Sequence, residues 1–368
     1  MRYIQQLFYI ALVAFIVISC SEQTSNNNTQ SDSSDSNDSS DVGNPSDHTN
    51  HSDDTGKKPE YPNTLDMDCY QQCIDKGAEE DVCLFFCSND EDKEPGKDED
   101  IDEDSLNPLT SITLDVEGET RHYRLFVPTT SNPSMPLIVF FHGGGGRDFS
   151  FPQQVAFQNL AEEQGILLAF AMGEIRTGEE GEWLLNTTAE RQQDVKYIRA
   201  LIADISSKQN VDSTRMYAVG YSLGSMYTYE VACHLSDHFA AIASHAGSMP
   251  ISPASCEQSK PVAVMHIHGT DDSIIPYDTT WDWKMWDIVG QMHDIPSLIQ
   301  YWSDKYNCQV HNDEDLGSST HIVHSECNAD VRVEHHRLLN VGHEWPQAIN
   351  TVTTPQVIWS FLSAFNRP

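Results

Sequence analysis

The stretch Gly220-Tyr221-Ser222-Leu223-Gly224 decides the fold of this 368-residue chain. An apolar run at 216–219 precedes it and predicts a buried strand, and the stretch 225–232 after it has helical character. A serine flanked by glycines on a sharp turn from strand to helix is held in a strained, accessible position, and the glycines let the two elements pass closely. The pattern predicts that Ser222 is a nucleophile. Because short Gly-x-Ser-x-Gly matches also occur by chance, the prediction depends on the rest of the chain.

A glycine-rich loop lies upstream, where the predicted buried strand 136–141 ends in a histidine and four glycines. Glycines leave backbone N–H groups uncovered, and acyl transfer needs such donors around the oxyanion of its tetrahedral intermediate. We expect the donors to be the N–H groups of Gly144, Gly145 and Leu223. A phosphate-binding loop is the alternative, but that loop needs a Lys followed by Ser or Thr, and this chain has Arg-Asp there.

Two downstream loops hold the partners that a nucleophilic serine needs. The predicted strand 261–267 ends in a loop with Asp271 and Asp272, and an alternating strand pattern at 331–339 precedes a loop with His343. In a catalytic triad the histidine acts as general base and the carboxylate orients it, and the order Ser, Asp, His is one of the known chain orders. Spacing alone does not choose between the two aspartates.

Other histidines of the chain have alternative interpretations. His335 and His336 are adjacent in a predicted strand, so they should point to opposite faces, one into the core and one into solvent. His266 and His268, with the aspartates that follow, faintly resemble the metal ligands of metallo-β-lactamase-like hydrolases. The spacing is off by one and the last histidine of that set is absent. We therefore expect neither a metal nor an organic cofactor.

Four segments together resemble the secreted esterase family of poly(3-hydroxybutyrate) depolymerases and feruloyl or acetylxylan esterases: HGGGG at 142–146, GYSLGS at 220–225, HGTDDSIIPY at 268–277 and GHEWP at 342–346. The resemblance covers roughly residues 110–366. In that family the third segment resembles HGxxDxxVPY, which puts the acid on Asp272. The nucleophile and base map to Ser222 and His343. The resemblance implies a serine hydrolase of carboxylic esters, with a peptidase of the same fold or a non-catalytic surface binding module as the alternatives.

The predicted elements indicate an α/β fold of the α/β-hydrolase type, with a mostly parallel twisted sheet and helices on both faces. Strands are expected near 111–116, 121–127, 136–141, 166–171, 215–219, 262–267 and 331–339. Helical patterns lie at 152–164, 189–208, 222–235, 296–306 and 354–365. The first two strands should form an antiparallel hairpin around Glu117-Gly118.

The first 107 residues differ in composition from the rest. A short apolar stretch that ends before Cys20 resembles a bacterial lipoprotein signal, with Cys20 as the lipidated residue, and an uncleaved signal anchor is the alternative. Both interpretations place the protein outside the inner membrane, and we expect it to be lipid-anchored in the bacterial cell envelope or secreted. The expected organisation is a signal peptide at 1–19, a disordered tether at 20–64, a Cys-rich helical hairpin at 65–88, an acidic linker at 89–107 and the catalytic domain at 108–368.

The chain carries a formal net charge of −35, and roughly 20 of these negative charges lie between Cys20 and Asn107. Much of the acidity therefore belongs to the segment that precedes the expected catalytic domain. Such a composition solvates the chain and disfavours nucleic acid as a partner. The expected partners are an ester substrate and, through the lipid, a membrane.

Cys69, Cys73, Cys83 and Cys87 form two CxxxC motifs in the expected hairpin. The i, i+4 spacing puts each pair on one helical face, so two short antiparallel helices would join Cys69 to Cys87 and Cys73 to Cys83. A zinc site is the alternative, although an exported context favours disulfides.

Four further cysteines lie in the expected catalytic domain. Cys233 with Cys256 and Cys308 with Cys327 are neighbouring pairs, and the resembling family has cysteines in similar places. Each disulfide would close a loop of about 20 residues, worth roughly 3 kcal/mol in the chain-entropy model.

Aromatic residues cluster near the expected site, where they can stack on sugars, phenolic acyl groups or polyester chains. Packing in a lid or core is the alternative for each. We expect contact with substrate from His142, Trp183, Tyr221, Trp281 and Trp345. The resemblance implies short-acyl, feruloyl or hydroxyalkanoate esters, which can be polymeric, as in plant polysaccharide esters or polyhydroxyalkanoate.

Overall fold

The computed structural model describes residues 67–75, 108–130, 132–144, 150–174, 183–256, 258–282 and 289–367. The predictions for the signal peptide, Cys20, the tether and the acidic linker lie outside these residues. In the Cys-rich segment the structure describes helix α1 (Met67–Asp75), and the two disulfides expected there lie outside the described part. None of the helices in the described ranges combines the length and apolar character needed to cross a bilayer.

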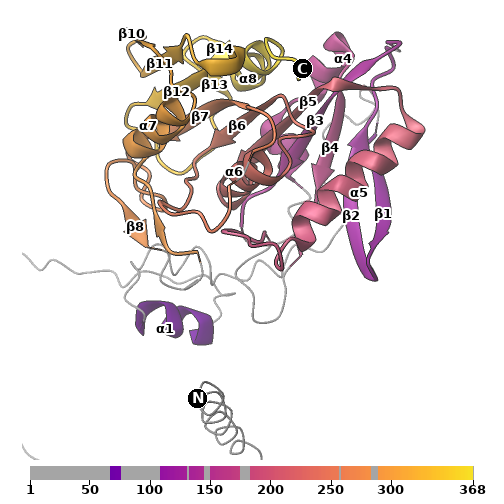
Figure 1. The fold of residues 1–368 in the computed structure, drawn as a ribbon, viewed down its shortest axis with the longest axis horizontal. Helices are drawn as coiled ribbons and strands as arrows, with labels where there is room; N and C mark the ends of the chain where they lie inside the picture. Colours follow the sequence, from indigo (N-terminus) through magenta and orange to yellow (C-terminus); the bar gives the residue numbers. More distant parts are fainter. Residues whose placement is uncertain are drawn as a thin grey trace, which may run out of the picture. The chain divides into compact units, whose positions relative to one another are not determined.

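A ten-stranded sheet forms the centre of the described structure, in the order β1-β2-β4-β3-β5-β6-β7-β12-β11-β10. Strands β4, β3, β5, β6, β7 and β12 are parallel, and an antiparallel pair flanks them at each edge (Figure 1). The bounds are β1 Thr110–Val116, β2 Glu119–Phe126, β3 Met135–Phe141, β4 Leu167–Ala171, β5 Val211–Tyr221, β6 Ala241–His245, β7 Ala263–Gly269, β10 Val310–Asp315, β11 Ser319–Ser325 and β12 Val333–Leu338. The carboxyl ends of the parallel strands therefore meet at one edge, where this architecture places ligands.

Helices cover both faces of this sheet (Figure 1). The side chains of Tyr229 in α6 and Trp302 in α7 stack with ring centroids 5.9 Å apart, so these two helices pack side by side. The bounds are α3 Phe151–Val155, α4 Gln158–Gln164, α5 Gln193–Lys208, α6 Leu223–His234, α7 Ile295–Lys305 and α8 Thr354–Leu362. A 3₁₀ turn at Asn328–Asp330 and two small pairs, β8 (Trp281–Asp282) with β9 (Gln291–Met292) and β13 (Ala348–Ile349) with β14 (Val352–Thr353), complete the fold.

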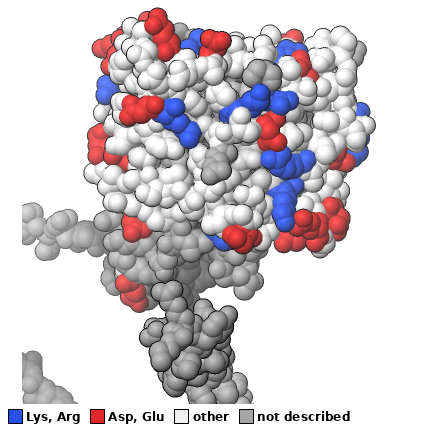
Figure 2. All heavy atoms as spheres, viewed as in Figure 1, with Lys and Arg blue, Asp and Glu red and all other residues white. Residues whose placement is uncertain are grey.

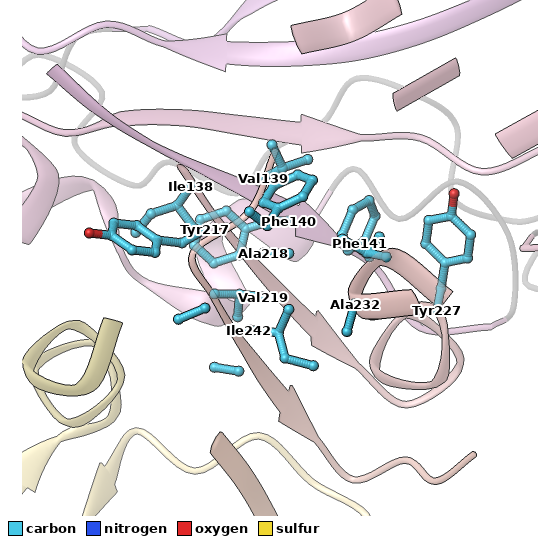
Figure 3. Packing of buried hydrophobic residues seen from close by; sticks show 14 of the residues in the cluster. Ile138, Val139, Phe140, Phe141, Tyr217, Ala218, Val219, Tyr227, Ala232 and Ile242 are labelled. Carbon is cyan, nitrogen blue, oxygen red and sulfur yellow. The ribbon is translucent and has the colours of Figure 1, made fainter. Parts of the chain in front are cut away.

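The core lies on both faces of the central strands. Every residue of β3 is buried, as expected for a parallel strand covered by helices on each side. Figure 3 shows Phe140 and Phe141 as neighbours on this strand, and their rings pack against different partners. Phe140 stacks on Phe170, whereas Phe141 meets Trp183 and Tyr227 edge to face.

The seven predicted strands are all present, and the hairpin turn lies where it was expected. Glu117 and Gly118 connect β1 to β2, both with positive φ, as the commonest two-residue hairpin turn requires. The sequence reading missed β6, β10 and β11. Strand β6 is only five residues long and buried at every position, and β10 has five exposed positions, so neither shows the alternation of a half-buried strand.

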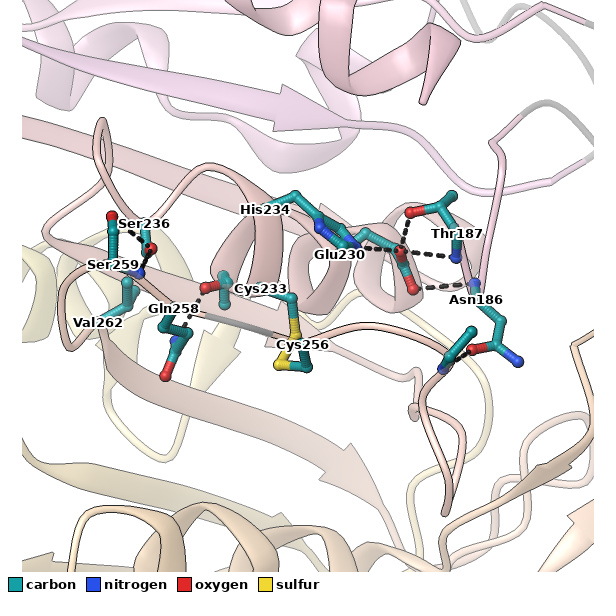
Figure 4. Close-up of a disulfide and its surroundings, with 12 residues drawn as sticks. Asn186, Thr187, Glu230, Cys233, His234, Ser236, Cys256, Gln258, Ser259 and Val262 are labelled. Carbon is teal, nitrogen blue, oxygen red and sulfur yellow. Dashed lines mark hydrogen bonds and ion pairs between the residues drawn. A yellow bond between two sulfur atoms is a disulfide. The ribbon is translucent and has the colours of Figure 1, made fainter. Parts of the chain in front are cut away.

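Two disulfides join the cysteine pairs expected in the catalytic domain. Cys233, in the last turn of α6, bonds to Cys256 in the loop that follows β6 (Figure 4). Cys308 bonds to Cys327 across the base of the β10–β11 hairpin. Near the first disulfide, Glu230 accepts hydrogen bonds from the backbone N–H groups of Asn186 and Thr187. These links hold the loops that surround α6.

Acidic and basic side chains both lie on the face shown in Figure 2, and several basic ones lie near one another on its right half.

Candidate active site

Ser222 lies at the turn between β5 and α6, with φ 53° and ψ −121°. A serine with positive φ is strained, and the surrounding packing holds it there. A Cβ on Gly220 would lie 2.1 Å from the Gly224 carbonyl oxygen, and a Cβ on Gly224 would lie 2.1 Å from the Phe141 carbonyl oxygen. Only glycine lets β5, α6 and β3 approach this closely.

Ser222, His343 and Asp272 form a continuous hydrogen-bonded line. The Ser222 Oγ lies 2.8 Å from the His343 Nε2, and the His343 Nδ1 lies 2.8 Å from the Asp272 Oδ2. The Asp272 side chain is fully buried and that of His343 is 5% exposed. The three residues lie in the loops that follow β5, β7 and β12. Ser222 and His343 are 121 residues apart in sequence.

Geometry distinguishes the two aspartates that spacing left open. The Asp272 Oδ1 accepts hydrogen bonds from the backbone N–H groups of Ile274, at 2.9 Å, and Ile275, at 2.8 Å. Asp271 is exposed, and its carboxylate accepts only the hydroxyl of Thr270 among the contacts described. Asp272 is therefore the aspartate whose side chain contacts His343.

A second histidine reaches Asp272 from behind. The His268 Nε2 lies 3.2 Å from the Asp272 Oδ2 and 2.9 Å from the Ile275 carbonyl oxygen. Burial alone would raise the pKa of Asp272, but the hydrogen bonds from His268 and His343 outweigh it and hold that pKa well below its usual range. Sequence reasoning did not find this role. The one available signal is that His268 lies at the end of the strand that leads to Asp272.

Two further buried residues, His266 and Tyr229, extend the hydrogen bonds from His268 into the interior. The His268 Nδ1 lies 3.1 Å from the His266 Nε2, and the His266 Nδ1 lies 2.8 Å from the Tyr229 hydroxyl. Because the Ile275 carbonyl can only accept, the His268 Nε2 carries a proton. In a neutral His268 the Nδ1 then accepts from His266, and His266 accepts from Tyr229. Burial lowers the pKa of His266 well below its ordinary value, which keeps this histidine neutral.

Two backbone segments with expected oxyanion donors lie next to Ser222. Leu223 is the first residue of α6, so its N–H is one of the unsatisfied donors at a helix start. A Cβ on Gly143 would lie 3.2 Å from the Ser222 Cβ, so the glycine-rich loop passes directly beside the serine. Gly144 follows in that loop, and Gly145 lies outside the described residues. The assignment of Gly144, Gly145 and Leu223 as donors stays a prediction.

The structure contradicts two of the expected substrate contacts. Trp183 is 0% exposed, and its Nε1 donates to the His142 carbonyl oxygen at 3.0 Å. Its ring stacks on Tyr227 with centroids 4.9 Å apart, so it is a core residue. His142 is 2% exposed, and its Nε2 accepts from the backbone N–H of Gly173 at 2.9 Å. Both residues hold the glycine-rich loop in place, from below the surface.

The other expected aromatic residues lie closer to the triad or stay partly exposed. The Tyr221 hydroxyl donates to the His343 carbonyl oxygen at 3.1 Å, and its ring lies 5.4 Å from that of His343. Trp345 is largely buried between Tyr221 and His245. Trp281 is half-buried and begins β8.

The expectation for His335 and His336 is half wrong. They do point to opposite faces, because His335 meets Tyr277 on one side and His336 stacks on His321 on the other. Both are buried, however, at 1% and 6% exposure. The unpredicted strand β11 pairs with β12 and places the His321 ring against His336.

Sequence and structure comparisons agree on the fold. The family model described as Phospholipase/Carboxylesterase matches residues 123–284. The bifunctional acetylxylan esterase/xylanase XynS20E of Neocallimastix patriciarum is 22% identical over 67% of this chain and 34% of its own length. Feruloyl esterase B of Piromyces equi is 25% identical over 65% of this chain and 44% of its own length. The chain thus spans between a third and a half of the length of these two relatives.

The solved acetyl xylan esterase from Aspergillus awamori superposes with a TM-score of 0.54, at 13% identity, over 70% of this chain and 99% of that one. This likeness concerns the fold. The parallel sheet and the strained serine turn show the α/β-hydrolase fold, and the sequence is similar to those of named acetylxylan and feruloyl esterases.

Proposed function

We propose that this chain is a serine esterase in which Ser222 is the nucleophile, His343 the general base and Asp272 the residue that orients the base. The observation that carries the proposal is the line of two 2.8 Å contacts from the Ser222 Oγ through the His343 ring to the Asp272 carboxylate. Hydrogen bonds of this length are within reach of proton transfer.

The reaction follows from these contacts. The Ser222 Oγ attacks the ester carbonyl carbon while its proton moves to the His343 Nε2. The N–H of Leu223 and those of the glycine-rich loop stabilise the negative oxygen that forms. The intermediate collapses to an acyl-enzyme when the alcohol leaves with the proton of His343. Water then attacks the acyl carbon, gives its proton to His343, and the acid is released with Ser222 restored.

Asp272 is suited to its role because it is buried, ionised and fixed. Its Oδ1 is held by two backbone N–H groups, so its Oδ2 faces His343 in one position. The carboxylate keeps the proton of His343 on Nδ1, which leaves Nε2 free to accept from Ser222.

The proposed substrates are short-acyl, feruloyl or hydroxyalkanoate esters, including those carried on polymers. The names of the relatives support the acetyl and feruloyl part of this proposal. A peptidase of the same fold, or a binding module without turnover, is the rival. Two disulfides in the described domain support an oxidising compartment, and we propose that the chain is exported and held by lipid at Cys20.

Covalent labelling with a fluorophosphonate probe tests the proposal, followed by a panel of p-nitrophenyl esters, methyl ferulate, hydroxybutyrate oligomers and peptide amides. The wild type should be labelled and should hydrolyse the esters, and Ser222→Ala should do neither while it keeps its circular dichroism spectrum. Faster hydrolysis of peptides than of esters would favour the peptidase, and no labelling of a folded wild type would favour the binding module.

A further inference from the structure

Three side chains with metal-binding atoms gather at the edge of the sheet, away from the triad. They are His321 on β11 and Glu334 and His336 on β12, referred to here as the edge cluster. The two histidines are direct partners in the antiparallel register, and Glu334 lies two positions before His336 on the same strand. Alternate residues of a strand share a face, so all three side chains project to one side of the sheet.

The ligand atoms of the edge cluster are close enough to share one ion. One such atom from each residue lies within 4.8 Å of the others. The His321 Nε2 is 3.0 Å from the Glu334 Oε2. The two imidazole rings are 4.3 Å apart and only 4° from parallel. Two ligands of a tetrahedral zinc ion, each about 2.0–2.1 Å from the metal, lie roughly 3.4 Å apart. A metal lies in the plane of each imidazole that binds it, and the two rings are nearly parallel, so one ring must rotate as well as close in before all three residues reach one ion.

The burial of the edge cluster is hard to explain by its hydrogen bonds alone. His336 is 6% exposed, and its Nδ1 has no hydrogen-bond partner among the described residues. An unpaired buried polar atom costs free energy, and a partner that the structure does not hold would remove that cost.

Glu334 is already held in the manner of a metal ligand. Arg332 Nη2 lies 2.9 Å from the Glu334 Oε1, which leaves the Oε2 directed at His321. Partners of this kind orient a carboxylate without occupying its second oxygen. The Arg332 guanidinium also lies over the ring of Phe365, 5.2 Å from its centroid. Phe365 follows α8, so this contact holds the guanidinium against the segment after that helix.

We propose that His321, Glu334 and His336 bind a divalent transition-metal ion of the zinc class, with solvent as the remaining ligand. Two imidazoles and one carboxylate are ligands that suit zinc and its neighbours better than calcium or magnesium. The ion would join β11 to β12 and so fasten the antiparallel edge to the parallel sheet, beside the β10–β11 hairpin that the Cys308–Cys327 disulfide closes. Its role is structural, because none of the three residues contacts the triad.

The alternative is a simple hydrogen bond between His321 and Glu334 with a stacked histidine beside it. That reading explains the 3.0 Å contact, but not the buried, unpartnered nitrogen of His336. The two readings differ in what zinc does to the protein.

Zinc binding to the full chain tests the proposal, with the metal first removed by a chelator. We would measure Zn²⁺ affinity by competition with a chromogenic chelator and the change in Tm on addition of Zn²⁺. The chain has 16 histidines, so the difference between variants is the readout, rather than total uptake. His321→Ala and His336→Ala should each weaken the tightest site at least tenfold and abolish the rise in Tm, and Glu334→Gln should weaken it while keeping a hydrogen bond to His321.

His311→Ala is the matched control. His311 lies on the same hairpin and pairs with His324, three positions beyond His321 and so on the opposite face. This variant should keep the affinity and the Tm response of the wild type. Less than a tenfold loss in His321→Ala, an equal loss in His311→Ala, or no rise in the Tm of the wild type with Zn²⁺ would each overturn the proposal. Loss of Zn²⁺ binding leaves esterase activity intact if the proposed function is right, so the two proposals can fail separately.

Discussion

His268 and His343 approach the same oxygen of Asp272. The His343 Nδ1 lies 2.8 Å from the Oδ2, and the His268 Nε2 lies 3.2 Å from it. His268 is fully buried, and its Nδ1 lies 3.1 Å from the His266 Nε2. Because the carboxylate is held from two sides, the position of the orienting acid depends on a residue that does not touch the nucleophile.

Replacing His268 should therefore slow catalysis through Asp272. His268→Ala should lower kcat roughly tenfold or more with little change in KM, since it loosens the orienting acid without touching substrate. His268→Gln keeps an N–H donor and should recover part of the loss. Steady-state kinetics on a p-nitrophenyl ester would measure both. An unchanged kcat in His268→Ala, or an effect confined to KM, contradicts the positioning role.

The two adjacent aspartates form a matched pair for testing the triad. Asp272→Asn should lower kcat by about 10⁴, because the amide favours the wrong tautomer of His343. Asp271→Asn should change kcat less than threefold, since Asp271 is exposed and contacts Thr270 rather than His343. The assignment of Asp272 fails if the two variants rank the other way.

The free energy of unfolding should begin to fall at a pH well above the range in which carboxylates titrate. Burial lowers the pKa of His245 and of His335 to about 3. In the unfolded chain each histidine has a pKa of about 6.5 and binds a proton that the native state excludes. Stability is therefore complete above about pH 6.5 and falls as the pH drops toward 3, by about 1.4 kcal/mol per pH unit for each histidine.

Urea unfolding between pH 7.5 and 5 measures this slope. His335→Gln should reduce it, because one buried histidine has gone. His311→Ala, on an exposed position of β10, serves as the control and should leave the slope as it is. A wild-type free energy of unfolding that is flat across this range would contradict the burial of these rings.

The glycines of the serine turn should be intolerant of any side chain. Gly224→Ala would drive a Cβ to 2.1 Å from the Phe141 carbonyl oxygen, so β3 and α6 must separate. We expect a loss of roughly 3 kcal/mol or more and of most activity, as for other overpacked positions. Gly342→Ala is the control, because its Cβ would meet only the Asp271 carbonyl oxygen at 3.9 Å. Equal Tm values for the two variants would argue against the close approach.

The edge strands illustrate what pattern reading missed. A central strand such as β3 is apolar at every position, and such a run is visible in the sequence. Strand β10 reads Val-His-Asn-Asp-Glu-Asp and exists because it hydrogen-bonds to β11, which in turn pairs with β12. Its stability comes from the neighbouring strand rather than from its own side chains, so its pattern carries little signal.

The sequence by itself determined the α/β class, the order of the strands that carry Ser222, Asp272 and His343, and the cysteine pairs of the described domain, because each depends on local pattern, chain order or short separation. Spacing left Asp271 and Asp272 open and the family resemblance favoured Asp272, which is the one that contacts His343 in the tertiary structure. Only the tertiary structure showed that Trp183 and His142 are buried beneath the site and that His268 contacts the Asp272 carboxylate. Those relationships join residues from different strands. They depend on which face each strand turns to its neighbours and on how tightly the sheet packs, and neither property is present in a run of adjacent residues.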